Sequence, residues 1–116
     1  MASEEAQPFS VAVAHVDGHM LVTVRGEIDL HTAPELTDAL NTAVRLPSPK
    51  LILDLSAVTF MDSAACNALI RTRDHAGTLA THLELRGVNQ TCRRVLEIAH
   101  LDELFTITPD GDGSDS

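Results

Sequence analysis

An acid and a hydroxyl stand next to each other in the stretch FMDSAAC, which runs from Phe60 to Cys66. Asp62 and Ser63 follow an apolar run and precede a helical pattern, which places them at a strand-to-helix corner. Ligand and partner sites are common at this edge of α/β sheets, and the free N–H groups of a helix start favour a phosphate. The pair is a candidate modification site, although helix capping is the commoner use of these residue types.

Serine catalysis and metal binding find little support. A hydrolase elbow would have the pattern G-x-S-x-G, whereas the residues around Ser63 are M-D-S-A-A. None of the six histidines lies in a recognisable triad motif. His15 and His19 flank a turn and could face each other across it, but two histidines alone make a poor metal site. With no glycine-rich phosphate loop either, we expect no enzyme activity, no metal and no cofactor.

A second group of polar residues lies in GEIDLHTAPEL, from Gly26 to Leu36. Thr32 and Glu35 have the spacing of a capping box, which predicts a helix from Thr32 onward. Asp29 lies in the loop before that helix, at the same end of the predicted sheet as Asp62 and Ser63. The two groups should therefore line a common surface, with turn and cap chemistry as the alternative role.

Composition limits the possible partners. The chain has 116 residues, 44% of them hydrophobic, and a net charge of −9. This acidic balance argues against binding to nucleic acid or to an anionic membrane. The N-terminus has no signal-peptide pattern, no apolar run reaches 18 residues, and Cys66 and Cys92 form no CxxC motif. We expect a cytoplasmic protein in which both thiols are reduced and buried.

Hydrophobic periodicity predicts one α/β domain at residues 9–108, a flexible N-terminus at 1–8 and a disordered acidic tail at 109–116. The expected order is β-β-α-β-α-β-α-β, with a mixed sheet of four to five strands opened by a β-hairpin and three or more helices packed on it. The first half of the chain is expected to form strands Phe9–His15 and Met20–Arg25 joined at Asp17-Gly18, a loop Gly26–Thr32, and a helix from Thr32 to the prolines at 47 and 49. Strand Leu51–Leu55, helix Ser63–Ala76, which ends at Gly77, and strand His82–Arg86 should follow. The last expected elements are a helix capped by Asn89, with Cys92, Val95, Leu96 and Ala99 facing inward, and strand Leu104–Ile107.

Together the two polar groups resemble motifs of the STAS domains, most closely those of the stand-alone bacterial anti-sigma factor antagonists. That family has G-E-[LI]-D-x-x-T before its first helix, and this chain has Gly26 to Thr32 as GEIDLHT. The family's phosphorylation loop is roughly F-[ML]-D-S-[ST]-G, and this chain has FMDSAA. The resemblance covers roughly Phe9 to Ile107. It departs at Ala64 and Ala65, where relatives carry a hydroxyl and a glycine; the added methyl should narrow partner choice.

The resemblance implies a partner-switching role in transcription regulation, of the kind that serves stress responses. Ser63 directly follows the loop aspartate and would accept the phosphate. The implied partners are a serine kinase that is also an anti-sigma factor, and a phosphatase acting on phosphorylated Ser63. The unphosphorylated form would bind the kinase and free a sigma factor, and phosphorylation would abolish binding. The implied contact residues are Asp29, Thr32, Asp62, Ser63, Ala64 and Ala65.

Two alternatives remain open. One is an interaction scaffold of the same fold in which Ser63 is never phosphorylated. The other is a small-ligand binder or enzyme that uses the corner formed by Asp62 and Ser63.

Overall fold

The computed structural model describes residues 8–108, so the expected tail at 109–116 and residues 1–7 of the expected flexible N-terminus lie outside them. The predicted α/β class and the predicted element order are confirmed, with a mixed five-stranded sheet and three helices within residues 8–108. The division into a domain and two flexible ends stays a prediction. The elements are β1 Ser10–Val16, β2 His19–Ile28, α1 Ala33–Arg45, β3 Lys50–Met61, α2 Ser63–Thr78, β4 His82–Arg86, α3 Gln90–Ile98 and β5 Thr106–Thr108.

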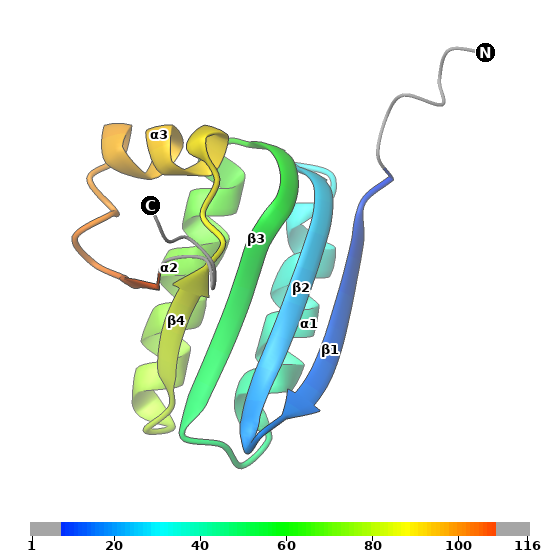
Figure 1. Ribbon diagram of the computed structural model, residues 1–116, viewed down its shortest axis with the longest axis vertical. Helices are drawn as coiled ribbons and strands as arrows, with labels where there is room; N and C mark the ends of the chain where they lie inside the picture. Colours follow the sequence, from blue (N-terminus) through cyan, green and yellow to red (C-terminus); the bar gives the residue numbers. More distant parts are fainter. Residues whose placement is uncertain (1–7, 109–116) are drawn as a thin grey trace.

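The strands follow chain order across the sheet, from β1 at one edge to β5 at the other. β1 pairs antiparallel with β2, and the remaining neighbours are parallel. Because successive right-handed crossovers move in one direction across the sheet, α1 and α2 lie side by side behind the same face (Figure 1). α3 lies near the carboxyl end of β3 (Figure 1). No helix within residues 8–108 is long and apolar enough to cross a membrane.

The opening hairpin turns at the two residues predicted for it. Asp17 has a φ of 53° and Gly18 a φ of 81°. A two-residue turn with positive φ at both positions matches the twist of the flanking strands. The register runs from Val16 opposite His19 to Ser10 opposite Arg25 without interruption.

Aliphatic side chains fill the space between the sheet and its two covering helices. Met20, Val22 and Val24 point inward from β2, as their alternation predicts. Fully buried leucines of β3, α1 and α2 surround them, namely Leu36, Leu40, Leu51, Leu53, Leu55 and Leu69. The thiols of Cys66 and Cys92 are free and buried, as expected.

One buried carboxylate lies on the sheet face that α1 and α2 leave uncovered. Glu84 of β4 accepts a hydrogen bond from the Thr108 hydroxyl and pairs with the Lys50 ammonium at 3.3 Å. These two contacts, the hydroxyl first, hold the pKa of Glu84 below its ordinary value although burial opposes them. The acid therefore links β3, β4 and β5.

The two central strands are longer than the sequence predicts. β2 continues to Ile28 and β3 to Met61, so the first part of the expected loop before α1, Gly26–Ile28, is strand. The register between these strands shifts twice, after Thr23 and after Gly26. Such irregularities let a strand continue past residues that break the alternation. The predicted strand ends at Arg25 and Leu55 were wrong, because the polar residues at these register shifts resemble loop residues.

Three boundaries near the C-terminal half also differ. α2 continues through Gly77 to Thr78, and the chain reverses at Ala80, whose φ is 60°. β5 covers Thr106–Thr108, so the expected strand start at Leu104 was wrong. In α3, Cys92 and Leu96 are buried and Val95 is half-buried, but Ala99 is exposed because the helix has ended before it.

Candidate functional site

The two polar groups found in the sequence lie together at the carboxyl ends of the neighbouring strands β2 and β3. Ile28 and Met61 are paired in the parallel register of β2 and β3. Asp29 and Asp62 are the residues that follow them, and the Asp62 N–H donates to the Ile28 carbonyl at 3.3 Å. The two acids therefore leave the sheet at adjacent strand ends, as the sequence predicts.

Asp62 is the N-cap of α2. Its carboxylate accepts hydrogen bonds from the N–H groups of Ala64 at 2.9 Å and Ala65 at 3.4 Å. Its backbone is extended, and its carbonyl accepts the N–H of Cys66 at 3.1 Å. Two of the N–H groups that a helix start leaves without intrahelical partners are satisfied in this way. Capping is therefore the work of Asp62 and not of Ser63.

Ser63 is the first residue of α2, and its side chain is exposed. Within residues 8–108 its hydroxyl has no hydrogen-bond partner. A phosphate on this oxygen would lie next to the Asp62 carboxylate, which already occupies the nearest backbone donors. The added charge would therefore face solvent or a partner.

A tight turn from Asp29 to Thr32 leads into α1. The Asp29 carboxylate accepts the N–H groups of His31 at 2.9 Å and Thr32 at 3.1 Å. The Thr32 hydroxyl donates to the Glu27 carbonyl at 2.8 Å and accepts the Asp29 N–H at 2.9 Å. The backbone N–H of Thr32, followed by that of His31, lowers the pKa of Asp29 from its ordinary value. Asp29 is thus an ionised turn residue.

The predicted capping box of Thr32 and Glu35 was wrong. The Thr32 side chain makes no capping bond to α1, and its backbone is already helical, with φ −96° and ψ −19°. The Asp29 carbonyl accepts the Ala33 N–H at 2.8 Å, so the turn itself connects to the helix. The S/T-x-x-E spacing occurs here with a different local geometry.

Ala64 and Ala65 differ in where they point. Ala64 is half-buried and lies at the surface, where it lines a hollow between α1 and α2. Ala65 is fully buried in the core. The Ala65 methyl is therefore not on the surface expected to contact a partner, and the expectation that it adds to that surface was wrong.

Apolar side chains that are not among the predicted contact residues lie around the Ser63 corner. Leu30 and Ile98 are 73% exposed and Phe60 is 45% exposed. Large apolar side chains gathered at one edge commonly mark an interaction surface. In the sequence, the one sign that Leu30 and Ile98 could be exposed is that neither belongs to the set of apolar residues expected to face the core.

A groove of ≈ 580 Å³ runs between α2 and α3 beside Ser63. Its walls are mostly apolar, and the polar groups are Asp62, Ser63 and Asn67 at one end. Cys66 also lines it, and burial, with the Asp62 charge second, raises the pKa of this thiol. A neutral thiol is a poor nucleophile. The apolar lining is Phe60, Met61, Ile70, Val95, Ile98, Ala99 and Leu101.

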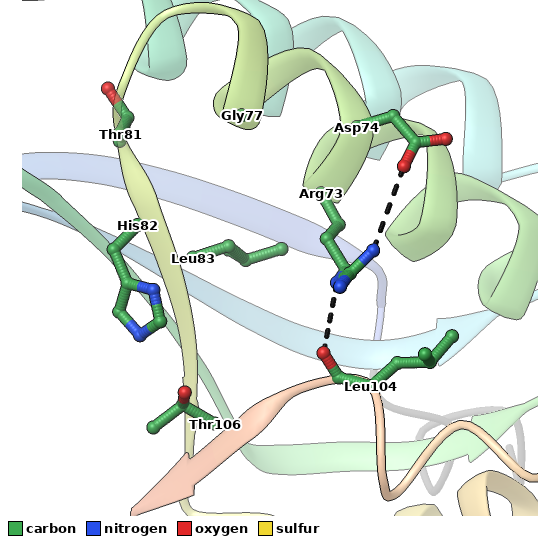
Figure 2. A pocket seen from close by; sticks show the side chains of 8 residues that line it. All are labelled: Arg73, Asp74, Gly77, Thr81, His82, Leu83, Leu104 and Thr106. Carbon is green, nitrogen blue, oxygen red and sulfur yellow. Dashed lines mark hydrogen bonds and ion pairs between the residues drawn. The ribbon is translucent and has the colours of Figure 1, made fainter.

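A separate hollow of ≈ 350 Å³ lies toward the other end of α2 (Figure 2). Arg73 extends across it toward the segment that leads into β5. Its Nε donates to the Leu104 carbonyl at 2.9 Å, and its Nη1 lies 3.8 Å from the Asp74 carboxylate. The guanidinium is thus engaged in holding this segment against α2, and the hollow is a packing feature.

Residues 8–108 contain no group of three or more His, Cys, Asp or Glu side chains placed to hold a metal ion. His15 pairs with Met20 and His19 pairs with Val16 in the hairpin register. Because adjacent pairs alternate between the faces of a sheet, the two histidines point to opposite faces. The expectation that they could face each other was wrong.

The STAS domain family model matches residues 10–112, which include the mixed five-stranded sheet and the start of α2, where Asp62 is the N-cap. The chain belongs to this family. It is 32% identical over 99 residues to the anti-sigma-F factor antagonist RsfB of Mycobacterium tuberculosis (strain ATCC 25618 / H37Rv), covering 84% of this chain and 80% of RsfB.

Solved structures agree with this assignment. An anti-sigma factor antagonist from Mycobacterium paratuberculosis superimposes with a TM-score of 0.81 at 32% identity, covering 90% of this chain and 89% of that one. The anti-sigma factor antagonist SpoIIAA in its unphosphorylated form has a TM-score of 0.73 at 17% identity, with 90% of each chain covered. The second likeness shows the fold alone.

Proposed function

We propose that this protein is an anti-sigma factor antagonist controlled by phosphorylation of Ser63. In the cytoplasm, the unphosphorylated form binds a serine kinase that is also an anti-sigma factor and thereby frees a sigma factor. Phosphorylation of Ser63 by that kinase ends the complex, and a serine phosphatase restores it. Relatives that carry the name anti-sigma factor antagonist support the proposal.

The observation that carries the proposal is that Asp62 caps α2 while Ser63, the next residue, is exposed and does not cap the helix. Asp62 satisfies the helix start, so the exposed Ser63 hydroxyl is not needed for the fold. A kinase can therefore modify it without unfolding α2. A serine that capped its own helix would instead lose its hydrogen bond on modification.

The electrostatics of the corner explain how a single phosphate could act as a switch. Phosphorylation adds about −1.5 to −2 charges next to the Asp62 carboxylate and near the ionised Asp29. Since Asp62 holds the N–H groups of Ala64 and Ala65, those donors are not available to neutralise the phosphate. A partner surface shaped for a neutral hydroxyl would bury an unmatched charge, which costs about 2–5 kcal/mol.

The test begins with co-purification of the kinase from the native cell and mapping of phosphate on this chain. Binding of the purified kinase to Ser63→Ala and Ser63→Asp is then measured by titration calorimetry. Ser63→Ala should bind like the wild type and resist ATP-dependent release, whereas Ser63→Asp should bind at least about tenfold more weakly. Thr42→Asp, an exposed position toward the C-terminal end of α1, is the matched charge control and should bind normally.

Two results would contradict the proposal. Equal affinities for Ser63→Ala and Ser63→Asp would show that charge at this corner does not control binding. A kinase complex without phosphate on Ser63, under turnover with ATP, would instead support the scaffold alternative, in which the same surface binds without modification.

A further inference from the structure

β1 forms one edge of the described sheet and has none of the usual features that prevent strand pairing. Proteins generally protect such edges with charged side chains, proline, bulges or very short strands. β1 has seven residues, SVAVAHV, with no proline and no acidic, lysine or arginine side chain. Its register with β2 is free of bulges. The opposite edge, β5, has only three residues and is protected by its length.

The hairpin determines which main-chain groups of β1 point outward. In a two-residue hairpin, the residues that flank the turn exchange both hydrogen bonds, which applies here to Val16 and His19. Antiparallel ladders alternate from this pair onward. The N–H and C=O groups of Val11, Val13 and His15 therefore point away from β2, where a further strand would find them.

We propose that a second copy of this chain pairs antiparallel with β1 across a two-fold axis at Val13, forming one continuous ten-stranded sheet. An isologous contact of this kind uses the same seven-residue edge on both sides and closes on itself. Head-to-tail pairing of β1 with β5 would form a ladder of only three residues. Self-pairing of β1 therefore satisfies more of the open backbone groups of β1 than pairing of β1 with β5 does.

Side chains in this arrangement are compatible with each other. Val13 is 42% exposed and would face the partner's Val13, so two half-exposed apolar side chains would cover each other. Ser10 would lie opposite the partner's Val16, which is 43% exposed. No like charges meet along the paired strands, because β1 contains no acidic or strongly basic residue.

The pairing leaves the Ser63 corner accessible. β1 lies at one side of the sheet, separated from β3 by β2, whereas α2 begins where β3 ends (Figure 1). The dimer therefore presents two Ser63 corners at once and does not depend on the function proposed for them.

The test uses the full chain in sedimentation equilibrium. The wild type should show a reversible monomer–dimer equilibrium. Val13→Lys and Val13→Glu should each raise the dissociation constant at least about tenfold, because the two-fold axis places like charges side by side. An equimolar mixture of the two variants should dimerise again, because opposite charges then meet. Leu79→Lys, at a position 45% exposed at the end of α2, is the control and should dimerise like the wild type.

Four results would overturn the inference. They are a wild type that stays monomeric at every attainable concentration, a dimer that tolerates both Val13 variants, a dimer that Leu79→Lys breaks as strongly, and a mixture that fails to associate. Circular dichroism melts verify that the variants are folded. Amide hydrogen exchange provides a second measurement, in which the N–H groups of Val11, Val13 and His15 should become protected as concentration rises.

Discussion

Replacing Asp62 separates the two properties of its side chain, hydrogen-bond capping and charge. Asp62→Ala leaves the N–H groups of Ala64 and Ala65 without the carboxylate that they contact at 2.9 and 3.4 Å. Loss of an N-cap costs about 1 kcal/mol, within a range of about 0.5–2. Asp62→Asn keeps an oxygen acceptor of the same length, and asparagine caps helices about as well as aspartate. Only the attraction of the charge to the helix N-terminus is then lost, about 0.3–1 kcal/mol for an exposed site.

These energies convert into measurable melting temperatures. Unfolding entropy is about 2.1 cal/mol/K per residue, or about 0.2 kcal/mol/K for a domain of about 100 residues. Asp62→Ala should therefore lower the melting temperature by about 5 °C, within a range of about 2.5–10 °C, and Asp62→Asn should lower it by less than Asp62→Ala, about 1.5–5 °C. Circular dichroism melts at neutral pH, with urea titrations to compare slopes, provide the values. Asp38→Ala, an exposed acid on α1, is the control and should change stability by no more than about 0.5 kcal/mol.

The outcome that refutes this reasoning is a similar loss in Asp62→Ala and Asp62→Asn. That result would assign the stabilisation to charge and remove the argument that Asp62 frees Ser63 from capping. An unchanged melting temperature in Asp62→Ala would refute the capping contribution altogether.

Three further measurements test the fold. Asn89→Ala should destabilise the protein by about 1–3 kcal/mol in urea unfolding, because the side chain caps α3 and its Nδ2 donates to the Val58 carbonyl at 2.8 Å; Asn89→Ser should recover the cap alone. The pKa of Glu84 is lower in the folded than in the unfolded chain, so the ionised side chain stabilises the fold above pH 4.5. This stabilisation is lost as the pH falls from 4.5 through the pKa of the folded state. In Glu84→Gln, the free energy of unfolding should therefore depend less on pH over that range, as urea titrations at several pH values would measure. Burial raises the pKa of Cys66, and raises that of Cys92 to about 11, so both thiols should react with a disulfide reagent at pH 8 at least about tenfold more slowly in the native than in the unfolded chain.

Sequence signals that act over a few residues predicted the structure well. The Asp17-Gly18 pair fixed the hairpin because positive φ at two successive positions suits few other residues. Asn89 was expected to cap α3, and its Oδ1 accepts the Cys92 N–H at 2.9 Å. β4 has the predicted bounds, His82–Arg86. In each case the responsible residues are close in sequence and their preference is strong.

Features that depend on tertiary pairing were not predictable in this way. β2 and β3 extend each other beyond Arg25 and Leu55 because each supplies the other's hydrogen bonds across two register shifts. Thr32 and Glu35 have the spacing of a capping box, but the Thr32 hydroxyl donates its hydrogen bond to the Glu27 carbonyl instead. The apolar groove beside Ser63 requires α3 to lie against α2, which no local pattern specifies. The site residues were thus found by motif, and their surroundings only by the fold.

Under the proposed function, the two departures from the family loop should have unequal consequences for recognition of the partner. Ala65 is fully buried, so its methyl group packs in the core, where it also stiffens the first turn of α2. Ala64 is half-buried and faces the hollow between α1 and α2, beside the exposed Leu30. A partner that donates a hydrogen bond to a hydroxyl here would find a methyl group and lose that bond. Discrimination among related kinases should therefore depend on Ala64, with Ala65 setting only how rigidly Ser63 is presented.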